Sequence, residues 1–201
     1  MDFDAYNEPV PVPRGGVRFP LQLQPPPGFR AEDPSTWPRV SGRLELVGGR
    51  LLYMPPCGDD QQDVASSVTG VLTHWRSAHP EFRVGSNEAG MQLGGEIRAA
   101  DVAVWRADTL PQRTGGYRKV PPVLAVEIAG RDEGEAELTD KARWYLDHGV
   151  AAVWLVFPLT REVVVVTQGA TDRVREGQRL PAIAELPELA PEASAFFDQL
   201  D

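Results

Sequence analysis

The sequence predicts an α/β or α+β domain in which a mixed β-sheet carries a helix on each face. Two nearly unbroken apolar runs, at residues 123–129 and 151–157, are short and rich in β-branched residues, which is typical of strands covered on both faces. Apolar residues recur at helical spacing within residues 61–78 and again after residue 134. Turn-forming glycines and prolines separate these segments, so strands and helices succeed each other along one chain.

The two ends of the chain are rich in proline. Residues 1–38 contain PVPVP and QPPPG and predict an extended or irregular arm on the surface. We expect residues 39–180 to form a single domain, because a chain of 201 residues suits one domain with a substantial core. Residues 181–201 predict a tail, containing proline, that packs back on this domain.

The domain begins with a predicted hairpin. Residues 43–54, RLELVGGRLLYM, predict two strands joined at Gly48-Gly49, because a glycine pair is a good hairpin signal. Glu45 lies between Leu44 and Leu46 and therefore points to the opposite face of its strand. This pattern alone favours a solvent-facing glutamate.

A helix within residues 61–78 comes next, and residues 82–93 then predict one or two strands, broken near Asn87-Glu88. Residues 102–105 predict another strand, with Asp101 at its start or just inside it. An aspartate in this place either caps a turn, which is the commoner role, or binds a metal ion.

The loop at residues 108–120 carries Arg113, Arg118 and Lys119. It is the best local candidate for contacting an anion or a phosphate backbone, although a solvated loop is the commoner interpretation.

Glu127 is the one charged residue in the apolar run 123–129. An unpaired buried carboxylate is costly, so Glu127 requires a cation, a hydrogen-bond donor or a proton. Lys141, on the next predicted helix, lies at the edge of the apolar face formed by Leu138 and Tyr145. Glu127 and Lys141 therefore form either a catalytic pair or a buried structural ion pair, and the residues alone favour the structural pair.

The chain continues with a second predicted hairpin. Residues 151–157 and 162–168 are apolar strands that turn at residues 158–160. Residues 172–179 are polar and predict an exposed continuation.

Composition limits the classes of function. A net charge of −9 argues against broad, charge-driven binding of nucleic acid, yet it leaves room for a local basic groove and suits carboxylates gathered around a divalent cation. The single cysteine, Cys57, excludes an intrachain disulfide and gives no zinc cluster. No apolar run is long enough to span a membrane, and the N-terminal residues lack a secretion signal. We therefore expect a cytoplasmic protein without a membrane partner.

Four segments together resemble the Uma-two family of restriction-endonuclease-like proteins, which are bacterial proteins placed in the PD-(D/E)XK nuclease superfamily. In order, they are LELVGGRL with Glu45, IRAADVAVW with Asp101, PPVLAVEIAG with Glu127, and KARWYLDHGVAAVWLVFP with Lys141 and Tyr145. The combination, spread over residues 38–168, is more specific than any one segment. The resemblance implies a restriction-endonuclease-like fold and a homodimer, in which the proline-rich arm is a candidate exchanged element.

The resemblance also implies a site. Asp101 and Glu127 would coordinate Mg²⁺ or Mn²⁺, with Glu45 as a third carboxylate, and Lys141 would orient or activate the attacking water. Such a set suits phosphodiester hydrolysis, because a divalent metal lowers the pKa of bound water and neutralises phosphoryl oxygens, and an ammonium adds electrostatic stabilisation. Tyr145, in the motif K-x-x-x-Y, is a supporting candidate.

Two departures from the family pattern qualify this site. Gln61, a second supporting candidate, stands where the family often has a histidine, and an amide cannot act as an acid or a base. Asp132 and Glu133 add negative charge near the site, which would hinder nucleic acid or recruit a second metal. We therefore expect a divalent-metal-dependent endonuclease acting on nucleic acid, with DNA favoured over RNA. The alternative is a catalytically weak or inactive binding or assembly module with the same fold.

Overall fold

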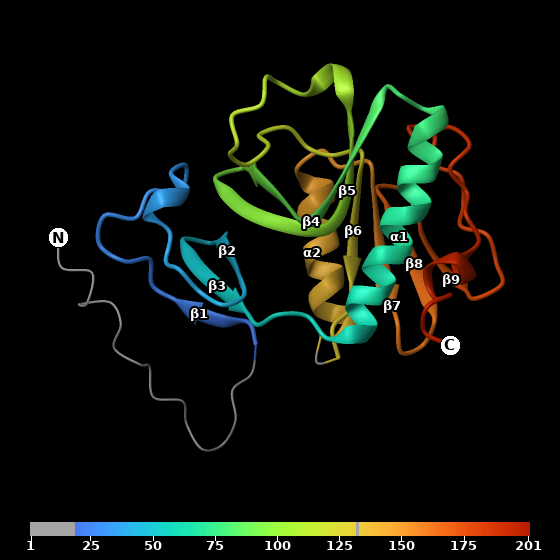
Figure 1. Ribbon diagram of the computed structural model, residues 1–201, viewed down its shortest axis with the longest axis horizontal. Helices are drawn as coiled ribbons and strands as arrows, with labels where there is room; N and C mark the ends of the chain where they lie inside the picture. Colours follow the sequence, from blue (N-terminus) through green and yellow to red (C-terminus); the bar gives the residue numbers. More distant parts are fainter. Residues whose placement is uncertain (1–18, 132) are drawn as a thin grey trace.

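A computed structural model of the chain describes residues 19–131 and 133–201 (Figure 1). In this part of the chain nine strands form one mixed sheet in the order β1-β3-β2-β5-β6-β7-β8-β9, and β4 pairs with β5. Strands β6 and β7 run parallel, and the other pairs are antiparallel. The strands are β1 (Leu21–Leu23), β2 (Arg43–Val47), β3 (Arg50–Met54), β4 (Phe82–Leu93), β5 (Glu96–Arg106), β6 (Leu124–Ile128), β7 (Ala152–Phe157), β8 (Glu162–Thr167) and β9 (Thr171–Arg175). The expected fold class is confirmed.

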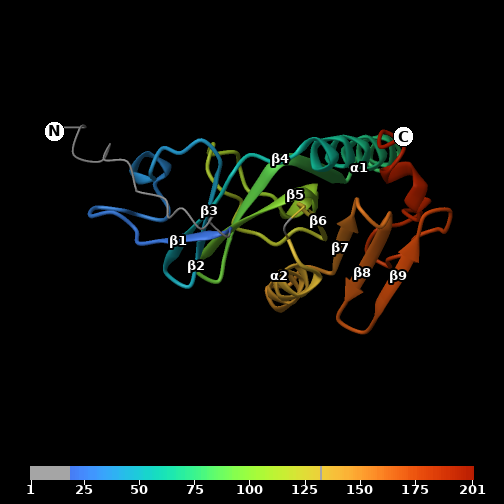
Figure 2. The same cartoon turned by 90° about the horizontal axis from the view of Figure 1, so that it is seen from below.

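Two helices, α1 (Asp59–Ala78) and α2 (Glu135–Asp147), cover opposite faces of the sheet (Figure 2). The central strand β6 is buried throughout, and its side chains alternate between two cores. Val126 and its even-numbered neighbours in β6 join the core on the α1 side, whereas Ala125 joins the core on the α2 side. Glu127 shares the alternation of Ala125 and is therefore directed toward α2.

Both predicted hairpins form. Strands β2 and β3 turn at Gly48-Gly49, where both glycines have positive φ, and β7 pairs with β8. Residues 82–93 form one long strand, β4, and not two. Its pairing with β5 shifts register between Ser86 and Ala89, which places a β-bulge at the predicted interruption.

Two expectations need correction. The strand predicted at residues 102–105 is the second half of β5, which begins at Glu96, so Asp101 lies well inside a strand. Residues 171–175, which overlap the expected exposed continuation at residues 172–179, are largely exposed but pair with β8 as the edge strand β9. A polar edge strand needs only backbone pairing on one side, so it shows little apolar alternation in the sequence.

Of the predicted N-terminal arm, residues 1–18 lie outside the described residues. The remainder contributes β1, which pairs with β3, so this segment extends the sheet. At the other end of the chain, Phe196 and Phe197 are buried in the core that α1 covers, and the Trp75 indole in α1 donates to the Pro187 carbonyl over 2.8 Å. No helix among the described residues is long and apolar enough to cross a membrane.

Candidate active site

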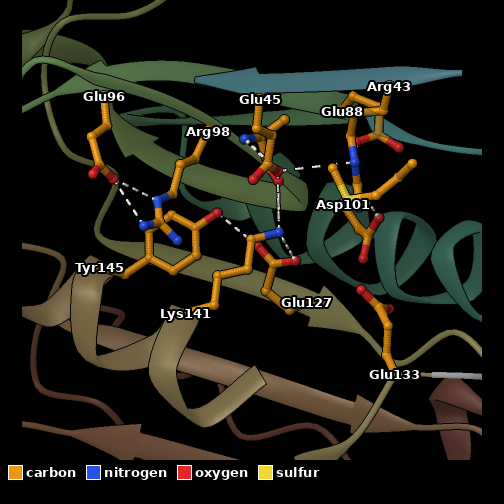
Figure 3. Close-up of polar contacts among 12 residues, drawn as sticks. Arg43, Glu45, Glu88, Glu96, Arg98, Asp101, Glu127, Glu133, Lys141 and Tyr145 are labelled. Atoms are coloured by element: carbon orange, nitrogen blue, oxygen red, sulfur yellow. Dashed lines mark hydrogen bonds and ion pairs between the residues drawn. The ribbon is translucent and has the colours of Figure 1, made fainter. Parts of the chain in front are cut away.

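The predicted acids surround one junction in the sheet. Strands β2 and β6 pair with the same edge of β5, β2 at Ile97 and β6 from Val102 onward. Residues 98–101 of β5 lie between these two pairings. Glu45 of β2, Asp101 of β5 and Glu127 of β6 come from the three strands that meet here, and α2 supplies Lys141 and Tyr145 (Figure 3).

Glu127 lies at the centre of these contacts. Its residue is 2% exposed, and both carboxylate oxygens accept hydrogen bonds: Oε1 from the Tyr145 hydroxyl over 2.6 Å and Oε2 from the Lys141 ammonium over 2.7 Å. Lys141 also lies 3.3 Å from Glu45 Oε1 and donates to the Ala99 carbonyl over 3.3 Å. The ion pair expected between strand and helix is therefore present, and Tyr145 is part of it.

Glu45 is buried, at 3% exposure, and is not the solvent-facing residue that the strand pattern alone favoured. The face opposite its neighbouring leucines lies against β5 and α2, where Glu45 Oε1 accepts a hydrogen bond from the Ala99 backbone amide over 3.2 Å. Glu45 therefore lies in the same group of side chains as Lys141.

Asp101 is held at the end of β6. Its Oδ2 accepts a hydrogen bond from the Ile128 backbone amide over 2.7 Å, and the side chain remains 10% exposed. The Gln61 amide, from the first turn of α1, donates to the Ile128 carbonyl over 2.8 Å. Glu133 accepts from the Gly130 amide over 2.8 Å. Three polar side chains thus converge on the backbone that directly follows Glu127, whereas Asp132 lies outside the described residues.

Arg43 is the residue that sequence reasoning missed. Its guanidinium lies 2.5 Å from Glu88, 3.6 Å from Asp101 and 3.9 Å from Glu45. The sequence contained a signal for this position, because Arg43 and Glu45 are two residues apart on a strand and therefore share a face. A charged residue at i−2 from a candidate buried acid is a natural counter-ion for it.

Burial and neighbouring charges shift the pKa values of the three carboxyls of this site. Burial raises the pKa of Asp101 to about 6, against the opposing effects of Arg43 and Lys141. Burial also raises the pKa of Glu127 to about 8; Lys141 opposes this rise, while the Asp101 and Glu45 charges add to it. For Glu45, burial works in the same direction, but Lys141 and Arg43 outweigh it and hold the pKa below its usual value. Burial is therefore the main reason that the Asp101 and Glu127 carboxyls hold their protons more tightly than usual.

A cleft of about 890 Å³ opens beside these residues. It lies between the hairpin β2–β3, the start of α1, the loop after β6 and the β7–β8 turn, and its lining includes Arg43, Gln61, Glu88 and Glu133. The loop at residues 108–120 contributes Tyr117 to the lining. Arg118, one of the candidate anion contacts of this loop, stacks over the Trp105 ring at 4.0 Å from its centroid.

The donors present suit a hard divalent cation in part. Among the described residues, no group of three or more histidine, cysteine, aspartate or glutamate side chains is arranged to hold a metal ion. Magnesium, however, is commonly held by one or two carboxylates while it keeps several waters. Burial raises the pKa of Asp101 and of Glu127, and a divalent cation beside these carboxyls would favour their ionised form. The types of donor present, the carboxylates of Asp101 and Glu127, are therefore those that Mg²⁺ or Mn²⁺ takes.

Comparison with known proteins identifies the family. None of the curated proteins compared matches the chain. One solved structure, a "putative nuclease belonging to DUF820" from Anabaena variabilis, superposes with a TM-score of 0.73 at 20% sequence identity, covering 83% of this chain and 96% of that one. At this identity the likeness shows the fold. The model of the Uma2 family, described as "Putative restriction endonuclease", matches residues 31–195, and the chain therefore belongs to the Uma2 family.

Proposed function

We propose that this protein is a divalent-metal-dependent endonuclease that hydrolyses phosphodiester bonds of nucleic acid. The observation that carries the proposal is the gathering of Glu45, Asp101, Glu127 and Lys141 around one junction of the sheet, beside an open cleft. The description of the Uma2 family and the name of the Anabaena variabilis structure support the nuclease part of this proposal.

Each residue has a proposed role. Asp101 and Glu127 hold Mg²⁺ or Mn²⁺, with Glu45 as a third carboxylate that balances Lys141. The metal, when bound, supplies a water of lowered pKa and neutralises charge on the phosphoryl oxygens. Lys141 orients the attacking water and offsets charge that develops on the phosphate. Burial acts to lower the pKa of Lys141, but Glu127 and Glu45 outweigh burial and raise it, so the ammonium stays charged.

Two residues position these groups. Tyr145 fixes one oxygen of Glu127 through its hydroxyl, which limits the carboxylate to one orientation. Gln61 holds the Ile128 carbonyl and so fixes the end of β6. A side chain that keeps a catalytic group within a narrow range of orientations contributes to rate without touching the substrate.

The proposal includes three finer statements. DNA is favoured over RNA as the substrate, the protein is a homodimer, as the family resemblance implies, and its location is the cytoplasm, as expected from the sequence. Sedimentation equilibrium of the full chain tests the homodimer directly: twice the chain mass supports it, and a single chain mass at all concentrations contradicts it.

A non-catalytic binding or assembly module is the second candidate. The observation that favours it is that both oxygens of Glu127 already have donors, Lys141 and Tyr145, so the carboxylate is satisfied without a metal. A buried ion pair of this kind is also compatible with a structural role.

Hydrolysis assays separate the two candidates. Labelled single-stranded DNA, double-stranded DNA and RNA are each incubated with the wild-type protein and Mg²⁺ or Mn²⁺. Cleavage that chelation stops and that falls at least about a hundredfold in Asp101→Asn supports the nuclease. The asparagine amide oxygen can still accept the hydrogen bond from the Ile128 backbone amide. A loss of activity in this variant therefore reflects loss of the negative charge at residue 101. No cleavage of any substrate, with the protein folded, supports the module.

A further inference from the structure

Arg43 is a second cation of the site that the proposed chemistry does not use. Its side chain is 13% exposed and lines the cleft, so it is close to the carboxylates and still within reach of a bound molecule. Arginine presents a planar fork of donors that matches the oxygens of a phosphate better than a lysine does.

The donors of Arg43 are incompletely used. One terminal nitrogen donates to Glu88 over 2.5 Å, and the same nitrogen lies 3.6 Å from Asp101, beyond hydrogen-bond distance. The other contacts the Met54 sulfur at 3.2 Å, which is a weak acceptor. Its Nε is buried without a hydrogen-bond partner. Glu88 is therefore the one strong acceptor that Arg43 has among the described residues (Figure 3).

Glu88 reaches Arg43 from a strained stretch of backbone. Asn87 and Glu88 both have φ of 58°, a conformation that non-glycine residues rarely adopt, and they form the bulge where β4 loses register with β5. Such strained residues are concentrated at functional sites, and bulges there redirect a side chain. The bulge here directs a carboxylate, 41% exposed, onto the cleft arginine.

We propose that Arg43 binds a phosphate of the nucleic-acid substrate and that Glu88 is its resting partner, which the phosphate replaces. The inference rests on the proposed function, because it says how the same site recognises its substrate. Replacement exchanges one anionic oxygen acceptor for another, so the guanidinium keeps its charge and its geometry while the strained bulge releases its contact.

Arg43 also bears on metal binding. A guanidinium 3.6 Å from Asp101 repels a divalent cation that approaches the same carboxylate. Removal of the Arg43 charge should therefore weaken binding of nucleic acid and tighten binding of metal. Removal of the Glu88 charge should do the reverse. Opposite changes in the two affinities are not expected from a residue that only supports the fold.

The test measures both affinities separately for each variant. Binding of a fluorescein-labelled single-stranded oligonucleotide is followed by anisotropy without divalent metal, and Mn²⁺ binding is measured by calorimetry without nucleic acid. The variants are Arg43→Gln and Glu88→Gln. Arg98→Gln is a matched control, since Arg98 lines the same cleft at 14% side-chain exposure but is held by Glu96 and stacks on Trp144.

We expect Arg43→Gln to weaken oligonucleotide binding about tenfold and to tighten Mn²⁺ binding several-fold, whereas Glu88→Gln shifts both affinities the other way. Glu88 is partly exposed, so Glu88→Gln should fold normally. Its two affinities therefore decide the test even if Arg43→Gln fails to fold. The proposal is overturned if the variants behave like Arg98→Gln, or if both affinities move together in a folded variant. Absence of Mn²⁺ binding to the wild type contradicts the proposed metal site, while the oligonucleotide titration still decides the role of Arg43.

Discussion

The Lys141 ammonium lies 2.7 Å from Glu127 Oε2, so a helix and the central strand of the sheet are joined by a buried ion pair. Glu45 extends this pair to a third element, because its Oε1 is 3.3 Å from the same ammonium. One lysine therefore balances carboxylates from two strands. Its loss would leave both of them buried without their closest cation, which is the basis of the first prediction.

Lys141→Met should destabilise the protein by about 3–5 kcal/mol, because it leaves buried carboxylates unpaired. The double variant Lys141→Met with Glu127→Gln should recover part of this loss, since the amide carries no charge. Urea denaturation measures each free energy of unfolding. Lys119→Met, at an exposed position, is the control and should change stability by less than about 0.5 kcal/mol. Strict additivity of the two changes at residues 127 and 141 would show that the residues do not interact.

Tyr145→Phe should cost about 1.5–3 kcal/mol, because it removes a buried hydrogen bond to an ionisable carboxyl while the ring still fills its place. Tyr53→Phe is the matched control: that hydroxyl donates to the Ser41 carbonyl over 2.9 Å at an exposed position, so its loss should cost less. Denaturant midpoints at a constant m-value give both free energies. Equal costs for the two variants would count against a special role of Tyr145.

Without metal, the free energy of unfolding should fall as pH rises from about 5 to about 8. The folded-state pKa values of Asp101 and Glu127 are raised, to about 6 and about 8, so the folded protein binds more protons than the unfolded chain across this range. Stability is therefore lost as these carboxyls ionise. Unfolding curves recorded across the range test this sign. Asp101→Asn should flatten the lower part of the dependence, and an unchanged slope in that variant would contradict the assignment.

A chain that ends at residue 180 should fail to unfold cooperatively. The missing tail carries Phe196 and Phe197, which pack in the core that α1 covers. It also carries Pro187, whose carbonyl accepts a hydrogen bond from the Trp75 indole of α1. Loss of the tail therefore exposes this side of α1. Truncation of even one buried phenylalanine costs about 3–5 kcal/mol, a large part of the stability of a typical domain. Thermal unfolding followed by circular dichroism makes the comparison. A sharp transition in the shortened chain would contradict this prediction, because it would show that residues 1–180 are stable without the tail.

The parts of the fold with strong periodicity were predictable. The buried strands β6 and β7, both hairpins and the two helices follow from apolar runs, glycine turns and helical spacing. The edge strands β1 and β9 were not predicted, because pairing at an edge depends on the backbone and leaves side chains exposed. The bulge at Asn87-Glu88 was visible as an interruption, but its effect on the direction of Glu88 depends on positive φ angles.

The sequence predicted most of the residues of the candidate site, but few of the contacts between their side chains. Glu127 was expected to need a cation, a hydrogen-bond donor or a proton, and Lys141 and Tyr145 provide the first two. Glu45 was misjudged by strand alternation alone, because alternation gives the two faces of a strand without saying which of them is covered. Arg43 was missed although its spacing from Glu45 was a signal. Its ion pair with Glu88 could not be predicted, because it depends on a bulge on β4 that is distant in sequence. The bond from Asp101 to Ile128 likewise depends on the meeting of β5 and β6.

Calorimetric titration of Mn²⁺ and Mg²⁺ tests most directly whether a divalent metal binds at Asp101 and Glu127. The wild type is compared with Asp101→Asn, with Glu127→Ala, and with Asp108→Asn as an exposed control whose carboxylate pairs with Arg106. We predict saturable binding in the wild type and the control, and an affinity at least about tenfold lower in the two site variants. No binding to the wild type in the millimolar range, or equal affinity in all four proteins, would contradict this prediction.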